Sequence, residues 1–369
     1  MSSRLFLGQA ANYKAKDVLR HTFSFATKRS AVELRDYLAE KYGTTRDRVV
    51  LMNNGRSAIA AGLKLTVPSG AEVIINGFTC YAVLQAIEKA GCVPVYADID
   101  QKTLNFSKKT LEKVLKNHPK AKAVVIQNTL GIMVNITEIE KIADEHSLVI
   151  VEDLAHCAGM RYADGREVGS VGAVAALSFG KGKSLDTITG GALIVNNRSL
   201  NLPIQATKRP KLSDSLRARW YPLLAAIGRG MSRVHLQKYW YGPLIKIHFI
   251  ERAVDAKLSL RQRPAYWQDK LVLRQLKQIG DKSAMPIRTH LFVRDRGELI
   301  EKLDRNGYNF REIWYDVPVS PVRYYKKVNF PEEECPAAVK TAKEIINLPT
   351  YYEKGELHGA FQIIKEYEK

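Results

Sequence analysis

The chain has 369 residues, of which 46% are hydrophobic and 26% charged, so its composition excludes a disordered protein and allows one to three domains. The formal net charge of +19 favours an anionic partner. No stretch is apolar for long enough to form a signal peptide or the roughly 20-residue span of a membrane helix, so we expect a cytoplasmic protein. Four cysteines without a C-x-x-C pair favour reduced thiols, and no metal site is expected.

The first two hundred residues alternate short apolar runs with segments of helical periodicity. Strands are predicted at 48–52, 72–75, 93–97, 123–126, 148–152, 173–179 and 191–195. Helices are predicted at 31–42, 57–65, 81–90, 107–117 and 136–146. Strands rich in Val and Ile between helices are typical of an α/β protein with a mostly parallel sheet covered by helices on both faces. In such sheets ligands bind beyond the carboxyl ends of the strands.

The pattern changes after residue 204. Residues 205–277 are helical, aromatic and strongly basic, with 16 Lys or Arg against 4 acidic residues, and we expect the helices there to be broken by Pro210, Pro222, Pro243 and Pro264. A smaller α+β unit follows, with a strand at 288–293 and helices at 296–306, 335–346 and 356–368. These changes predict three parts: a large α/β domain at 1–204, the basic segment at 205–277 and a small domain at 278–369.

Two side chains just after predicted strands suit an aldehyde cofactor with a pyridine ring. Asp153 ends an apolar strand, and Lys183 lies in a loop of small residues after the next strand. A lysine amine forms a Schiff base with such an aldehyde, and an acid keeps the ring nitrogen protonated so that the ring accepts electrons. The alternatives are an ordinary surface lysine, and an Asp153 paired with a local cation such as Arg161.

Other residues near these strand ends suit the remainder of the same cofactor. Gly55 and Ser57 lie where a turn enters a helix, whose N–H groups form an anion site, and Ser178 adds a hydroxyl. Alternatively, Ser57 is a simple N-cap and Ser178 a buried serine at a strand end. His156 either packs against the cofactor and steadies Asp153, or is a structural histidine.

Taken together, these motifs resemble the DegT/DnrJ/EryC1/StrS family of fold-type-I, pyridoxal-phosphate-dependent aminotransferases, which mostly act on nucleotide-linked keto sugars. The resemblance lies in the ordered series 54–58, 71–74, 78–79, 95–99, 151–156, 168–172, 178–179, 190–191, 296–303 and 345–349. It implies a seven-stranded type of sheet between helices, with a small C-terminal α+β domain.

The resemblance also implies roles for single residues. Lys183 corresponds to the Schiff-base lysine, with Lys181 as a rival, and Asp153 to the partner of the pyridine nitrogen. His156 stands where the family usually has Gln. Since Cys80 stands where the family has a stacking aromatic, Tyr81 is the candidate to replace it. The implied cofactor-binding residues are Gly55, Arg56, Ser57, Tyr81, Asp153, His156, Ser178 and Lys183.

For function, the resemblance implies a homodimer that moves an amino group from an amino acid, glutamate by analogy, to a nucleotide- or lipid-linked keto sugar. Lysine at position 183 favours transamination over the sugar-dehydrating relatives, which carry His there. Residues 205–277 replace a family segment that helps to bind substrate. This replacement leaves open a binding or regulatory protein with the pyridoxal-phosphate fold but without transaminase activity.

The basic segment has three alternative interpretations. Trp and Tyr beside Arg and Lys suit a peripheral contact with an anionic membrane, at its inner face. The alternatives are a solvated basic face and a groove for a nucleotide diphosphate. Nucleic acid is not expected, because no recognised binding motif accompanies the charge.

Overall fold

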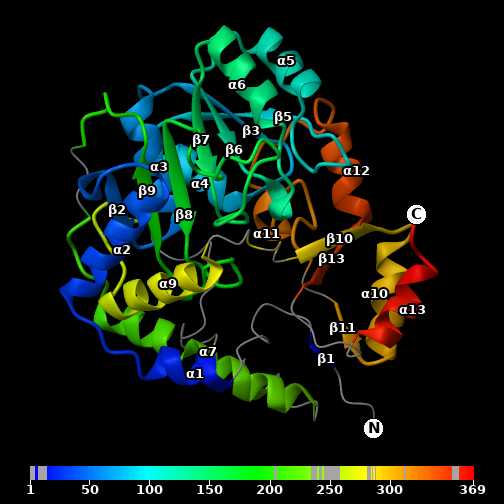
Figure 1. Cartoon of the computed structure of the whole chain (residues 1–369). Helices are drawn as coiled ribbons and strands as arrows, with labels where there is room; N and C mark the ends of the chain where they lie inside the picture. The colour runs from blue at the N-terminus through cyan, green and yellow to red at the C-terminus, as the bar shows by residue number, and fades with distance from the viewer. Residues whose placement is uncertain are drawn as a thin grey trace.

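The computed structural model describes residues 5–6, 15–202, 206–233, 239–240, 243–244, 258–280, 284, 286, 288–310, 313–350 and 357–369. A seven-stranded sheet of order β2-β9-β8-β7-β6-β3-β5 forms its centre (Figure 1). Its strands are β2 (Val49–Met52), β3 (Glu72–Asn76), β5 (Val93–Ala97), β6 (Ala123–Ile126), β7 (Val149–Asp153), β8 (Val174–Ser178) and β9 (Gly191–Val195). The run from β8 to β5 is parallel, while β9 is antiparallel to both of its neighbours. The predicted mostly parallel α/β sheet is confirmed.

Helices cover both faces of this sheet, and their apolar sides form two cores. The first core includes side chains of α2 (Lys28–Lys41), α5 (Lys108–Asn117), α6 (Ile136–Glu145) and α9 (Tyr266–Ile279). The second core includes side chains of α3 (Gly55–Thr66), α4 (Tyr81–Ala90) and α12 (Pro336–Glu344). The strands are buried on both faces, as their continuous apolar sequences require.

The C-terminal part has its own small core. There β10 (Arg288–Phe292) pairs antiparallel with β13 (Ile345–Pro349), and α10 (Arg296–Arg305) and α13 (His358–Lys365) lie beside them (Figure 1). The short strand β1 (Leu5–Phe6) joins this part by pairing with β11 (Tyr308–Asn309). The predicted helix at 335–346 is too long: α12 ends at Glu344, because the β-branched Ile345 and Ile346 begin β13.

A second link between the two parts lies next to the site described below. The strand β12 (Val319–Ser320) pairs in parallel with β4 (Thr79–Cys80), which immediately precedes α4. The short helix α11 (Val322–Tyr325) follows β12. This pairing brings the chain around residue 315 to the carboxyl ends of the central strands.

Within the basic segment, α7 (Leu212–Arg233) contains Pro222, so the predicted break there is wrong. Proline removes one helical hydrogen bond, but the helix continues because its inner residues Ala218, Tyr221 and Ala225 are buried. Pro210 and Pro264 lie just ahead of α7 and α9, outside both helices. The helix α1 (Ala15–Thr22), which packs against α7, was not predicted. Most of residues 234–257 lies outside the described part of the chain.

The loop between β7 and β8 is held by the buried carboxylate of Glu152. It accepts the N–H groups of Gly169 (2.7 Å), Val171 (2.9 Å) and Gly172 (2.6 Å), and the hydroxyl of Tyr162 (2.7 Å). Burial raises the pKa of Glu152, and these hydrogen bonds oppose that shift. Because neighbouring side chains alternate along a strand, Glu152 anchors the loop while Asp153 points to the other face of the sheet.

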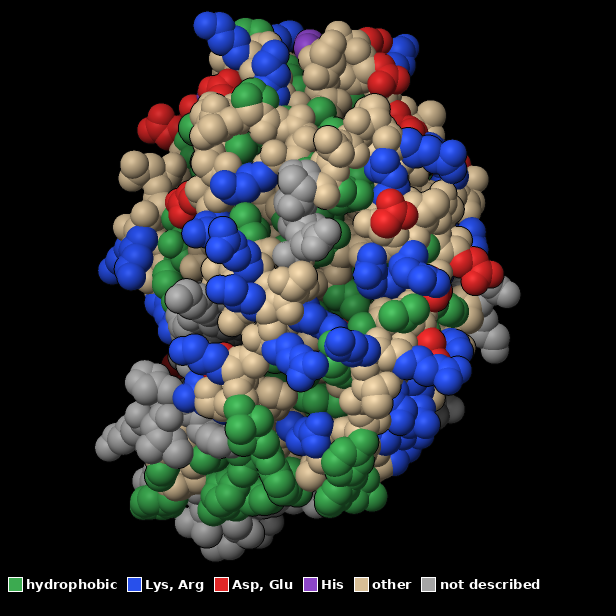
Figure 2. Space-filling model, turned by 90° about the vertical axis from the view of Figure 1, so that its left-hand side faces the viewer, with side chains coloured by type: hydrophobic (Ala, Val, Ile, Leu, Met, Phe, Trp, Pro, Cys, Tyr) green, Lys and Arg blue, Asp and Glu red, His purple; other side chains and the backbone are tan. Residues whose placement is uncertain are grey.

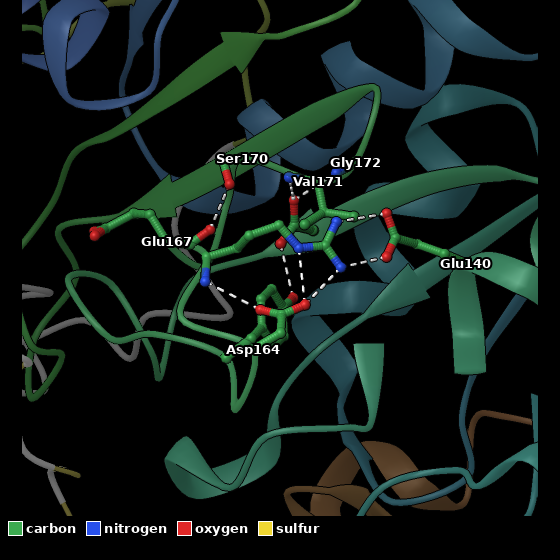
Figure 3. Close-up of polar contacts among 9 residues, drawn as sticks. Glu140, Asp164, Glu167, Ser170, Val171 and Gly172 are labelled. Atoms are coloured by element: carbon green, nitrogen blue, oxygen red, sulfur yellow. Dashed lines mark hydrogen bonds and ion pairs between the residues drawn. The ribbon is translucent and has the colours of Figure 1, made fainter. Parts of the chain in front are cut away.

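The same loop is also tied to α6 at the surface (Figure 3). Arg166 donates from Nη1 and Nη2 to the two carboxylate oxygens of Glu140, at 2.8 and 2.5 Å, and from Nε to Asp164 at 2.8 Å. The side chains of this cluster are 30–40% exposed, so their ion pairs contribute much less than the buried bonds of Glu152.

We expect Glu152→Gln to lower the free energy of unfolding by about 3 kcal/mol, because the glutamine amide sets an NH₂ group against backbone N–H donors. Urea unfolding followed by circular dichroism measures the change. The matched control is Glu140→Gln, which removes a charge from the partly exposed ion pairs of the same loop. Its expected loss of unfolding free energy is under about 1 kcal/mol. Equal losses in the two variants would contradict the anchoring role of Glu152.

Candidate active site

Lys183 lies in the loop that joins β8 to β9, five residues after the end of β8. The buried side chains of Phe179 and Leu185 fix the loop on either side of it. Asp186 accepts the N–H groups of Gly182 (2.8 Å) and Ile188 (2.9 Å) and so closes the loop on itself. The backbone of Lys183 is therefore presented in a defined position at the carboxyl edge of the sheet.

The Lys183 amine lies among aromatic and ionisable groups. Its Nζ is 4.7 Å from the centroid of the Trp314 ring. Burial lowers the pKa of Lys183; the Cys80 thiol and the Asp153 carboxyl oppose that shift, and the nearby Arg288 adds to it. A lowered pKa increases the fraction of neutral amine, which is the nucleophilic form that attacks an aldehyde.

Asp153 is the last residue of β7 and lies next to the Lys183 loop, because β7 and β8 are neighbours. It is only 5% exposed, and its Oδ1 accepts the N–H of Ala155 at 3.0 Å. Burial raises its pKa to about 6, against the effects of that N–H and of Lys183. The alternative partner Arg161 is excluded, since its guanidinium lies 3.6 Å from Glu167 and bonds the Gly165 carbonyl.

His156 is buried close to this pair. Its Nδ1 accepts the N–H of Leu130 at 3.1 Å, so the neutral ring carries its proton on Nε2. Burial lowers the pKa of His156 well below its usual value, and the charges of Lys183 and Arg288 lower it further. The ring stacks on Trp314 with centroids 5.3 Å apart. His156 is thus a neutral, fixed ring beside the lysine.

The predicted phosphate residues meet where β8 ends and α3 begins. A Cβ on Gly55 would lie 2.8 Å from the Cβ of Ser178, so only glycine lets the two segments approach this closely. Asn54, not Ser57, caps the helix by accepting the Ser57 N–H at 2.8 Å. Ser57 instead donates its hydroxyl to Asn53 at 2.8 Å. Gly55 and Arg56 supply the first N–H groups of α3 to this junction.

Two other predicted residues contact neighbouring helices. The Arg56 guanidinium donates to Gln85 of α4 at 2.6 Å. Tyr81 stacks on Tyr324 of α11, with ring centroids 4.4 Å apart and planes 6° from parallel. The rings in contact with Lys183 and His156 are instead those of Trp314 and Tyr315.

Sequence reasoning missed three residues of the C-terminal part that lie at the site. Tyr315 accepts a hydrogen bond from Gln127 at 3.2 Å and packs on Phe78. Arg288 is buried at the start of β10, with its Cζ 4.4 Å from the centroid of the Trp314 ring. The sequence does distinguish Trp314 in one respect, because it is the single tryptophan outside the basic segment.

The chemistry of these residues fits pyridoxal phosphate. The buried Asp153 carboxyl, with its raised pKa, is suited to a protonated ring nitrogen as its partner. Lys183 would supply an amine for the aldehyde. The space that a Cβ on Gly55 would fill lies at a helix N-terminus, a place suited to a phosphate. The fold and these residues define a pyridoxal-phosphate enzyme of fold type I.

Comparison with known proteins identifies the family. The pattern of the DegT/DnrJ/EryC1/StrS aminotransferase family matches residues 8–221, and the chain belongs to that family. It is a pyridoxal-phosphate-dependent aminotransferase. The chain is 25% identical to GDP-perosamine synthase of Caulobacter vibrioides over 88% of this chain and 85% of that protein. It is 28% identical to spore coat polysaccharide biosynthesis protein SpsC of Bacillus subtilis over 82% and 80% of the two chains.

The fold agrees with solved members of the same family. A DegT/DnrJ/EryC1/StrS aminotransferase from Brucella abortus superposes with a TM-score of 0.65 at 19% identity, covering 95% of this chain and 93% of the other. At that identity the likeness concerns the fold alone.

Proposed function

We propose that this aminotransferase transfers the amino group of an amino acid, with glutamate as the expected donor, to a nucleotide- or lipid-linked keto sugar for cell-surface polysaccharide. The lysine–acid pair, Lys183 and Asp153 at adjacent strand ends, is the observation that carries the proposal. Relatives named for perosamine synthesis and for spore coat polysaccharide support the sugar as acceptor.

Each residue has a distinct task in this reaction. When bound, pyridoxal phosphate supplies an electron-accepting ring. Lys183, as a neutral amine, would remove and return the proton at the reacting carbon, for which a lowered pKa is suitable. Asp153 holds the ring nitrogen protonated, His156 fixes one side of the site, and the start of α3 with Ser178 binds the phosphate.

A half-reaction tests the proposal directly. The purified protein, loaded with pyridoxal phosphate, is mixed with single amino acids while cofactor absorbance is followed. Glutamate is expected to shift the absorbance and release 2-oxoglutarate, and a panel of nucleotide-linked keto sugars should reverse the shift. Full cofactor loading with no shift from any amino acid would overturn the proposal and favour the binding or regulatory alternative.

A homodimer in the cytoplasm is part of the proposal, since fold-type-I sites generally form between two subunits. Sedimentation velocity of the loaded protein should give twice the mass of the chain. A monomer with full half-reaction activity would contradict this part of the proposal.

Arg288 is the residue we assign to the donor's carboxylate. It is a buried cation, and its guanidinium lies near the Trp314 ring, as the amine of Lys183 does. We expect Arg288→Gln to raise the glutamate concentration that gives half-maximal rate by about 10- to 100-fold, with a smaller change in the maximal rate, because a charge-assisted hydrogen bond is lost.

Arg294→Gln is the matched control, because this exposed arginine two residues after β10 bonds a C-terminal carbonyl rather than the site. Arg288→Lys should restore part of the donor affinity. An unchanged glutamate dependence in Arg288→Gln would remove Arg288 from the donor site.

A further inference from the structure

A large group of apolar side chains is exposed on α1, on the residues just after it and on α7. Phe25 is 76% exposed and Leu212 is 75% exposed, and both are normally interior residue types. Figure 2 shows hydrophobic side chains gathered at the lower end of the face where these helices lie. We call this surface the α1–α7 face; its exposed apolar residues are Leu19, Phe23, Phe25, Leu212, Leu216, Trp220 and Ile227.

The exposed apolar residues of α7 lie along one side of the helix. Leu212, Leu216 and Trp220 follow one another at four-residue intervals, and Ile227 continues the same side of the helix. The opposite side of α7 is already buried, with Ala218 packed against Trp267 of α9. The helix therefore has two apolar sides, and only one of them faces the protein core. A continuous exposed apolar patch of this kind marks an interaction site.

Positive charge borders this face. Lys208, Arg209 and Lys211 are exposed immediately before α7, and Lys16 is exposed on α1. Arg219 of α7 contacts the residues just after α1: its guanidinium is 5.9 Å from the ring centroid of Phe25, and it donates to the Ser24 carbonyl at 3.0 Å. In Figure 2, blue Lys and Arg side chains lie beside the apolar group.

Asp17 and Asp214 are the acidic residues of α1 and α7. Asp17 lies 3.6 Å from Arg20, and Asp214 lies 3.8 Å from Arg217, so each carboxylate is already next to a cation of its own helix. An apolar centre with a basic rim complements a surface that offers hydrocarbon beneath anionic headgroups. Within the described residues no helix is long and apolar enough to cross a bilayer, so the contact concerns the surface of the membrane.

We propose that the α1–α7 face docks this aminotransferase on membranes that contain anionic phospholipids. A second copy of the chain is the other occupant to consider. Apposing two such faces would bring their basic rims together, and like charges repel, whereas the same charges are attracted to an anionic surface. The apolar side chains enter the interface, and the lysines and arginines bind the headgroups. This docking stands independently of the sugar chemistry proposed above.

Co-sedimentation with vesicles tests the docking. The cofactor-loaded protein is expected to bind vesicles that contain phosphatidylglycerol, to bind phosphatidylcholine vesicles much less, and to dissociate as salt is raised. The double variant Phe23→Ser, Leu216→Ser should bind at least about tenfold more weakly, because two large apolar side chains no longer enter the interface. Lys208→Glu, Lys211→Glu should weaken binding without changing the apolar centre.

The matched control is Val93→Ser, Phe361→Ser, which removes two exposed apolar side chains from other elements and should leave vesicle binding unchanged. All variants should keep the unfolding transition and cofactor absorbance of the parent protein, since the substituted positions are exposed. Equal binding by the parent and the Phe23→Ser, Leu216→Ser variant would overturn the proposal. So would dissociation of a dimer in that variant without any vesicle binding by the parent, because the face would then join two copies.

Discussion

Replacing Lys183 with alanine is expected to lower the rate of transamination by about 10⁴-fold or more, since both the covalent attachment of the cofactor and the proton transfer at the substrate carbon are lost. The absorbance band of the lysine-linked cofactor should disappear from the purified variant. Added pyridoxal phosphate should still bind at the start of α3, because the Gly55 and Ser178 cradle is unchanged. A variant that keeps the lysine-linked band would contradict the assignment.

The rival lysine of the same loop supplies the control. Lys181 lies two residues before Lys183, yet its Nζ is 4.9 Å from the centroid of the Tyr221 ring on α7, away from Trp314. Lys181→Ala should therefore retain the band and keep the rate within a few-fold of the parent. The two variants remove the same charge from the same loop, so a difference between them reports the position of the amine alone.

The meeting of Asp153 and Lys183 was predictable because it depends on local pattern. Each follows a strand whose apolar sequence is continuous, and parallel strands bring their carboxyl ends to one edge of the sheet. The same reasoning placed Gly55 and Ser178 near that edge, and the structure brings them into contact. The apolar runs in the sequence define where the strands end. Those strand ends were sufficient to predict that these four residues lie near one edge of the sheet.

The other half was not predictable because it depends on a pairing between distant segments. Trp314 and Tyr315 reach the site through the pairing of β12 with β4, in which Val319 lies opposite Thr79. Nothing in the residues near Trp314 specifies that partner. Tyr81 also depends on a distant segment: it is adjacent to Cys80 in sequence, and the start of α4 brings its ring against Tyr324 of α11.

Asp153→Asn is expected to lower the transamination rate by about 10²- to 10⁴-fold, because a neutral amide cannot stabilise a protonated ring nitrogen as a carboxylate does. Rates of the glutamate half-reaction measure the change. The lysine-linked band should remain, since Lys183 and the phosphate cradle are intact. Asp164→Asn, which alters a partly exposed acid of the β7–β8 loop, is the control and should keep the parent rate.

The same substitution has a consequence for stability that does not depend on activity. The pKa of Asp153 is raised from 3.8 to about 6, so unfolding of the cofactor-free protein releases a proton between roughly pH 4 and pH 6. The free energy of unfolding should therefore fall as the pH rises through that window, by up to about 3 kcal/mol relative to Asp153→Asn, whose amide does not titrate. Urea unfolding of both proteins at pH 4 and pH 7 measures the difference. Parallel pH profiles would show that burial does not raise the pKa of the Asp153 carboxyl in the folded protein.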